Sequence, residues 1–296
     1  MKALVAGWFS FEGMGATAGD LLTRDLVCRW LEEAGRRYDV AVAPPFSGGR
    51  DWRAADPADY SDVVFVCGPF GNGSPIPEFL ERFTGRRLIG LSLTMLEPLE
   101  TWNPFTLLLE RDSSATARPD LAFLASAPAV PVAGVVLAHD QPEYRNDAHD
   151  VANAALERLV ASRPMAAVRI DTRLDVANAA GLRTAEEVES LIARMDVVLT
   201  TRLHGLVLAL KHGVPVVAID PVLGGAKLQR QADTVGWPAC FVAGAVSDGD
   251  VTRAFEYCLT ATAREHARRA GDHARTRLSE VRDRFIQAMK SPARVG

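Results

Sequence analysis

The sequence lacks any apolar run of roughly 20 residues, the length that a membrane-spanning helix needs. It also lacks a basic segment followed by a long apolar stretch near residue 1, where a short apolar strand is predicted instead. Its four cysteines are scattered and form no CxxC pair, which is typical of a reduced compartment and not of a disulfide framework. We therefore expect a soluble, cytoplasmic protein without a transmembrane segment.

An excess of basic residues is also missing, because the formal net charge is −4. A nucleic-acid-binding protein usually carries a basic face, so we expect no nucleic-acid partner. The glycine loops at 13–19 and 68–73 follow neither the GxGxxG nor the Walker A pattern and are weak nucleotide signatures. The histidines show no metal-ligand spacing such as HExxH. We expect neither a bound metal nor a cofactor.

What is present is enough apolar material for a globular core, 48% of 296 residues, arranged as short apolar runs that alternate with helical patterns. Such runs are typical of parallel strands covered by helices on both faces. In the first half, the spacing of apolar residues predicts a helix over 19–34. It predicts strands over 2–6, 38–43, 63–67, 88–93 and 105–109.

Three prolines within residues 119–131 predict a crossing between two lobes, after which the alternation starts again. The second series predicts strands over 133–137, 166–170, 197–200 and 214–219, helices over 148–161, 185–195, 203–211 and 227–235, and a helical tail over 248–290. Two such series predict two doubly wound, Rossmann-like α/β lobes, residues 1–128 and 129–296. One larger sheet is the alternative architecture.

Basic side chains follow two successive strands of the second lobe. Arg202 and His204 come just after the strand 197–200, and His204 lies where free N–H groups and the dipole of the next helix favour an anion. Lys227 begins the following helix, one αβ unit further along. Ligands of open α/β sheets bind beyond the carboxyl ends of the strands. We therefore expect these three side chains to share one cleft.

In the first lobe, Arg111 takes the corresponding place after the strand 105–109, and Asp112 or Ser113 is a plausible N-cap of a following helix. Together with Arg202, His204 and Lys227 it suits a ligand with several negative charges, such as a phosphate plus a carboxylate. Each of these residues also has a purely structural interpretation. Arg111 could form a local ion pair with Asp112, the other basic residues could serve surface ion pairs, and the histidine could be structural.

The order of these residues resembles the polysaccharide pyruvyl transferase family. The resemblance is clearest over 196–236, where Asp-Val-Val-Leu-Thr-Thr-Arg-Leu-His-Gly is followed by Gly-Val-Pro-Val-Val-Ala-Ile-Asp and then by Lys227. Weaker echoes occur at Gly19-Asp20, at the glycine loop from Gly68, at Arg111-Asp112-Ser113-Ser114 and at 119–123. Two segments depart from the family pattern, since 114–119 is short and the loop 8–18 is long.

The resemblance implies a fold similar to the two-lobed GT-B glycosyltransferases, with phosphoenolpyruvate as donor substrate and a sugar or glycan as acceptor. The product would be a pyruvate ketal, formed without a metal and with release of phosphate. His204 would be the catalytic acid. Substrate binding would fall to Arg111, Arg202, Lys227, Gly19, Asp20 and Gly68. The donor would lie in the second lobe and the acceptor on the side of the first.

Two other functions remain open at this point. A GT-B-type glycosyltransferase that uses a nucleotide sugar would need a base pocket and a ribose-binding carboxylate, for which Asp220 is available. A non-catalytic carbohydrate- or phosphate-binding protein could keep the same fold without turnover. No prediction of oligomeric state follows from the sequence.

Overall fold

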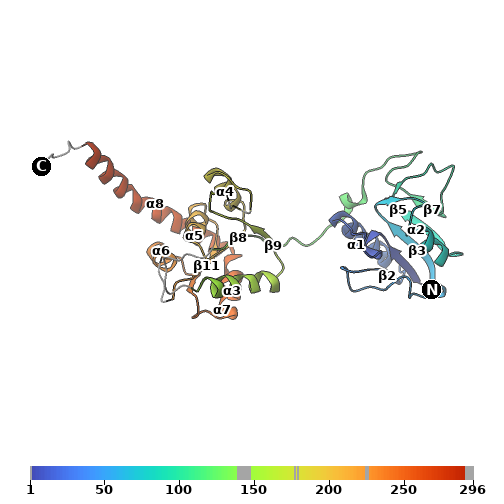
Figure 1. Cartoon of the computed structure of the whole chain (residues 1–296), viewed down its shortest axis with the longest axis horizontal. Coiled ribbons are helices and arrows are strands. Elements are labelled where there is room, and N and C mark those ends of the chain that lie inside the picture. The colour runs from blue at the N-terminus through green and yellow to red at the C-terminus, as the bar shows by residue number, and fades with distance from the viewer. Residues whose placement is uncertain (1, 139–147, 177, 179, 224–226, 291–296) are drawn as a thin grey trace. The chain divides into compact units, whose positions relative to one another are not determined.

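The chain forms two compact units, Met1–Pro128 and Ala129–Gly296 (Figure 1). The computed structural model describes residues 2–138, 148–176, 178, 180–223 and 227–290. Each unit contains its own five-stranded sheet, in which every strand pairing is parallel. The predicted α/β class with two Rossmann-like lobes is confirmed. The alternative of one larger sheet is wrong.

The sheet of the first unit has the strand order β2-β1-β3-β5-β7. Its strands are β1 (Lys2–Ala6), β2 (Tyr38–Val40), β3 (Tyr60–Val66), β5 (Arg87–Leu91) and β7 (Leu107–Leu109). The short strands β4 (Pro69–Phe70) and β6 (Thr94–Met95) form a separate parallel pair. The helices are α1 (Ala18–Glu33) and α2 (Ile76–Arg82), with 3-10 turns η1 (Trp8–Ser10), η2 (Pro57–Asp59) and η3 (Leu121–Leu124). The last turn, η3, lies against α1.

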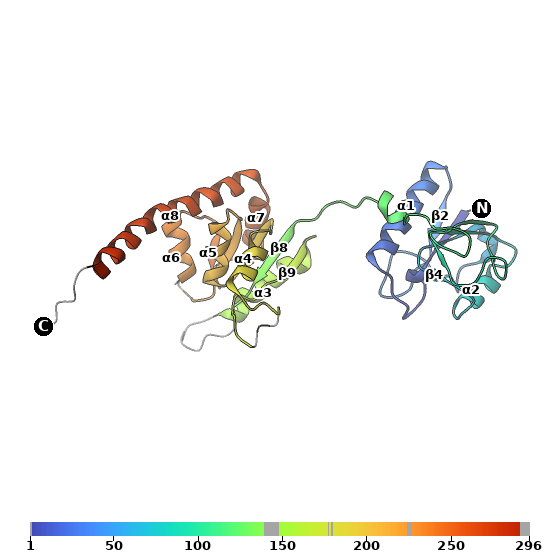
Figure 2. The ribbon, with the colours of Figure 1, turned by 90° about the horizontal axis from the view of Figure 1, so that it is seen from above.

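The sheet of the second unit has the order β12-β11-β10-β8-β9. Its strands are β8 (Val132–Val136), β9 (Ala166–Arg169), β10 (Val197–Thr200), β11 (Val216–Asp220) and β12 (Cys240–Val242). Its helices are α3 (His149–Ser162), α4 (Ala185–Ile192), α5 (Leu203–Lys211), α6 (Lys227–Val235), α7 (Asp248–Cys258) and α8 (Ala261–Lys290). Helix α3 packs against α7, whereas α5, α6 and α8 pack against one another (Figures 1 and 2).

The local sequence explains why these elements form where they do. All four residues of β10 and all five of β11 are buried, as expected for central strands covered on both faces. Helix α1 begins after Thr17, whose hydroxyl accepts the Asp20 N–H while the Asp20 carboxylate accepts the Thr17 N–H. The apolar spacing predicted α5 and α6 with their observed ends. It missed β12 and α2, which are only three and seven residues long.

One sequence-based expectation about the first unit is wrong. Residues 110–120, directly after β7, form no helix, so neither Asp112 nor Ser113 is an N-cap. Instead, Asp112 pairs with Ala117 in an antiparallel bridge, and the Ser113 hydroxyl accepts the N–H groups of Ala115 and Thr116. A serine satisfies backbone donors equally well in a tight turn and in a helix cap, which is why the residue type could not separate the two.

Candidate functional site

The turn between β10 and α5 is held by two threonines at the end of the strand. The Thr200 hydroxyl donates to the Val136 carbonyl oxygen at 2.8 Å and accepts the Arg202 N–H at 2.9 Å. The Thr201 hydroxyl accepts the Ala138 N–H at 2.7 Å and donates to Asn153 at 2.8 Å. Both threonine side chains are buried. The turn that carries Arg202 is therefore anchored to β8 and α3.

Gly205 allows the first turn of α5 to lie directly over the strand ends. A Cβ atom at this position would be 2.2 Å from the Thr200 Oγ1 and 3.1 Å from a Val136 methyl group. Any larger residue would push α5 away from β8 and β10. Packing therefore explains why the Arg-Leu-His-Gly sequence has a glycine at this position. The glycine keeps His204 close to the carboxyl edge of the sheet.

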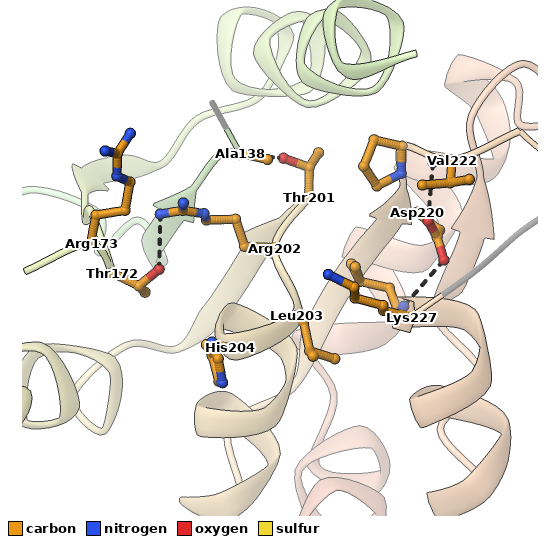
Figure 3. Close-up of a pocket in the computed structure, with 12 residues that line it drawn as sticks. Ala138, Thr172, Arg173, Thr201, Arg202, Leu203, His204, Asp220, Val222 and Lys227 are labelled. Carbon is orange, nitrogen blue, oxygen red and sulfur yellow. Dashed lines mark hydrogen bonds between the residues drawn. The ribbon is translucent and has the colours of Figure 1, made fainter. Parts of the chain in front are cut away.

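A cavity of about 250 Å³ lies at this edge and is lined by the three predicted basic residues, Arg202, His204 and Lys227 (Figure 3). The other residues that line it are Ala138, Thr172, Arg173, Thr201, Leu203, Asp220, Pro221, Val222 and Leu228. Its size is just below the usual range for drug-sized ligands and suits a small molecule. Four basic side chains and one carboxylate around such a space favour a small ligand with several negative charges.

Arg202 is held at the wall of the cavity by the loop that follows β9. Its Nη1 lies 3.0 Å from an Asp171 carboxylate oxygen. The same nitrogen lies 3.1 Å from the Thr172 hydroxyl, a hydrogen bond that Figure 3 shows. The side chains of Arg202 and Asp171 are only 13% and 12% exposed. Burial lowers the pKa of Arg202 from its ordinary value, and the charge of Asp171 opposes that fall. In the part of the chain that the structure describes, no hydrogen bond uses its Nε or Nη2, so these donors can meet a ligand.

Lys227 is placed by the buried carboxylate of Asp220 at the end of β11. One oxygen of Asp220 accepts the Val222 N–H, and the other accepts the N–H groups of Leu228 and Gln229, each at 3.1 Å. These bonds tie the start of α6 to the strand end, so the first residue of the helix, Lys227, faces the cavity (Figure 3). Both oxygens of Asp220 therefore serve backbone groups of the second unit.

Arg173 also lines the cavity, and the sequence reasoning missed it. It lies on the loop after β9, where its guanidinium pairs with Asp175 at 2.5 Å. The signal that could have found it is its distance of a few residues from the predicted strand 166–170. Because β9 is parallel to β8, the loop after it leaves from the same edge of the sheet as the loop that carries Arg202.

The remaining predicted residues, Gly19, Asp20, Gly68 and Arg111, lie in the first unit. Gly19 and Asp20 are in the first turn of α1. Gly68 has φ +78, and a Cβ atom there would lie 2.2 Å from the Trp8 ring. Arg111 follows β7, where Nε is 2.9 Å from Asp112, Nη1 is 2.8 Å from Asp120, and Nη2 contacts the Thr94 hydroxyl.

Cys67 shows that most of these first-unit residues share one end of their sheet. Burial raises the pKa of the Cys67 thiol to about 11. The charges of Asp20 and Asp120 also raise this pKa, and the charge of Arg111 lowers it. These side chains are therefore within electrostatic range of the thiol next to Gly68. The structure thus groups the predicted residues in two sets, one at the carboxyl edge of each sheet.

Part of the chain matches a known family. Residues 107–221 match the family model described as polysaccharide pyruvyl transferase. The resemblance predicted from the sequence is confirmed over this segment, which includes Arg111, Arg202 and His204 and ends before Lys227. No curated protein matches the chain in sequence.

Solved structures similar to the chain include three glycosyltransferases. The calicheamicin glycosyltransferase CalG4 has 14% identity and a TM-score of 0.36, covering 98% of this chain and 99% of its own. The spinosyn forosaminyltransferase SpnP has 14% identity and a TM-score of 0.31, covering 92% and 94%. The Escherichia coli ADP-heptose heptosyltransferase II has 12% identity and a TM-score of 0.28, covering 88% and 98%. At these scores the likenesses carry no conclusion about activity.

The described residues contain neither a metal-binding cluster nor a helix suited to cross a membrane. Among them, no group of three or more His, Cys, Asp and Glu side chains is arranged to hold a metal ion. None of the helices formed by these residues combines the length and the apolar character that crossing a bilayer requires.

Proposed function

We propose that the protein transfers the pyruvyl group of phosphoenolpyruvate to a sugar or glycan as a ketal and releases phosphate, without a metal ion. The observation that carries this proposal is the small cavity lined by Arg173, Arg202, His204 and Lys227. Phosphoenolpyruvate is a small molecule with a phosphate and a carboxylate, and it matches this charge and volume. The family match over 107–221 supports the same substrate class.

The reaction needs an acid, a base and a binding site for phosphate. The methylene carbon of the donor takes up a proton while positive charge develops at the neighbouring carbon. A sugar hydroxyl then attacks that carbon and gives its proton to a base. A second hydroxyl displaces phosphate from the same carbon, and its proton leaves with the phosphate. A positioned acid contributes about 10²- to 10⁴-fold to such a step.

In this proposal His204 gives the proton to the methylene carbon and recovers one from the first hydroxyl. It is exposed and lies in the first turn of α5, so a ligand in the cavity can reach its ring. Arg202 and Lys227, from two neighbouring strand ends, hold the carboxylate and the phosphate, and a cation beside the phosphate stabilises its departure. The buried Asp171 keeps the Arg202 guanidinium in place.

The acceptor is assigned to the first unit, where Gly19, Asp20, Gly68 and Arg111 gather at the carboxyl edge of the sheet. We place the reaction in the cytoplasm, which agrees with four buried free cysteines. A nucleotide-sugar glycosyltransferase is the second candidate. The bonds of Asp220 to three backbone N–H groups disfavour it, because the carboxylate that would bind a ribose already serves the fold. A non-catalytic binding protein is the third.

Calorimetry in the presence of a chelator tests the donor. We expect phosphoenolpyruvate to bind, and to bind more weakly as salt rises, because several charge pairs contribute. Binding of a nucleotide sugar without binding of phosphoenolpyruvate would favour the glycosyltransferase instead. Release of phosphate in the presence of a panel of glycans then separates an enzyme from a binding protein that has no turnover.

A further inference from the structure

Helix α8 carries one apolar face along its whole length, and the rest of the second unit covers only the first part of that face. Ala263, Ala267, Ala270 and Gly271 are buried. A Cβ atom on Gly271 would lie 2.4 Å from the Leu210 carbonyl oxygen, so α8 and α5 are in close contact there. After this contact the helix runs on for almost twenty residues and extends away from the rest of the second unit (Figures 1 and 2).

The uncovered part of the face consists of Leu278, Val281, Phe285 and Met289, which we call the distal stripe. These side chains are 61%, 60%, 65% and 70% exposed. Their spacing of three or four residues places them within an arc of about 80° on the helix. The stripe adjoins an apolar cavity of about 320 Å³ between α5, α6 and α8, to which Leu278 belongs. Large apolar side chains gathered on one exposed face mark a surface that binds a protein, a membrane or a ligand.

Arginines line both sides of the distal stripe. Arg277 and Arg284 are seven residues apart and lie along one side, and Arg275 and Arg282 lie in the same way along the other. The acidic residues Glu280 and Asp283 are on the face of the helix opposite the stripe, and Arg282 and Arg275 each form an ion pair with an aspartate, Asp283 and Asp272. Residues 275–290 contain five basic and two acidic residues, whereas the chain as a whole has a net charge of −4.

We propose that the distal stripe binds the surface of a lipid bilayer that contains anionic lipids. A helix with large apolar side chains on one face and arginines beside them lies in the interface, with its apolar face among the acyl chains and its charges at the headgroups. A second copy of the chain fits this face poorly. In a pair of such helices, parallel or antiparallel, the arginines beside each stripe would face arginines of the other.

Co-sedimentation of the full chain with vesicles tests this inference. We expect binding to phosphatidylglycerol–phosphatidylcholine vesicles, little binding to pure phosphatidylcholine, and release at high salt. Arg282→Gln together with Arg284→Gln should weaken binding about tenfold or more, since each basic residue near the surface contributes about fivefold. The matched control is Arg268→Gln with Arg269→Gln, which removes the same charge from the proximal half of α8.

Phe285→Ser tests the apolar part of the stripe and should weaken vesicle binding about tenfold. Gln287 lies on the polar face, within one helical turn of Phe285, so Gln287→Ser should leave vesicle binding unchanged. The inference would be overturned by no binding to either vesicle, by equal binding of the Phe285 and Gln287 variants, or by a chain that is dimeric until Phe285 is replaced. Loss of thermal stability in Phe285→Ser without vesicles would also overturn it, since the stripe would then be packed against protein. None of these readouts depends on the proposed transferase activity.

Discussion

The two units place an arginine after a strand of each parallel sheet, yet the two arginines have different surroundings. Arg202 is joined to one carboxylate, Asp171, which is distant in sequence, and it faces a cavity lined by other basic residues. Arg111 is joined to two carboxylates, Asp112 and Asp120, which lie within nine residues of it. The same residue type at the same kind of position is therefore paired with one carboxylate at the wall of a cavity in one unit, and with two carboxylates close to it in sequence in the other.

His204→Gln gives the largest expected effect, because His204 lines the same cavity as Arg202 and has no counterpart among the predicted residues of the first unit. We expect turnover to fall by about 10²- to 10⁴-fold, because the histidine would act in the transition state, while the donor Kd stays within several-fold. Steady-state phosphate release and calorimetry measure the two quantities. His212→Gln is the control, since His212 lies at the other end of α5 and pairs with Glu189. Near-normal kcat in the His204 variant would leave the proposed mechanism without its acid.

The arginines themselves give the next largest effect. Arg202→Ala should raise the donor KM by about 10- to 150-fold, the cost of one charge-assisted contact to a bound anion. Arg111→Ala should leave the donor KM within about twofold, because we assign Arg111 to the acceptor, and it should raise the acceptor KM by about tenfold, since two aspartates already balance its charge. Arg111→Lys should recover only part of the loss in acceptor binding, since an ammonium lacks the guanidinium fork. A donor KM that rises about tenfold in Arg111→Ala would contradict the assignment of Arg111 to the acceptor.

Gly205→Ala tests the packing that brings α5 over the strand ends. A Cβ atom 2.2 Å from Thr200 Oγ1 forces the helix or the strand to move, and we expect a loss of about 1–3 kcal/mol in the free energy of unfolding. Urea denaturation measures it. Gly249→Ala in α7 is the matched control, because a Cβ atom there would lie 3.4 Å from the flexible tip of the Arg253 side chain, which can move aside. That variant should be neutral or slightly more stable.

The smallest effect concerns the ion pairs of the first unit. Burial alone would raise the pKa of Glu110, but hydrogen bonds from its own backbone, Arg118 and Ser113 hold that pKa below its ordinary value. A depressed pKa in the folded state contributes stability above the ordinary value, and this stability is lost as the pH falls from about 5 toward 2.

Thermal unfolding across this pH range should therefore show a smaller drop in Tm for Glu110→Gln than for the wild type, by about a few degrees. Glu81→Gln is the control, because Glu81 is exposed on α2 and forms no ion pair within the part of the chain that the structure describes. Equal pH profiles for wild type and Glu110→Gln would show that the Glu110 pair does not stabilise the first unit.

The repeating unit of the fold was readable from the sequence, because strands buried on both faces need continuous apolar runs and α5 and α6 need apolar residues at helical spacing. The same logic placed Arg202, His204 and Lys227 after neighbouring strands, and parallel strands bring their carboxyl ends to one edge. The apolar spacing did not predict short elements such as β12 and α2, since three to seven residues contain too few repeats of any period.

Only the tertiary structure decided what each charged side chain meets. Asp171 reaches Arg202 because β9 lies beside β8 in the sheet, and this neighbourhood depends on strand order, which local periodicity does not contain. The role of Asp220 as the anchor of α6, the approach of Gly205 to Thr200 and the addition of Arg173 to the cavity follow in the same way from backbone packing. Composition determined that the chain would bury a parallel core, whereas the register and order of the strands determined which charges stayed available for a ligand.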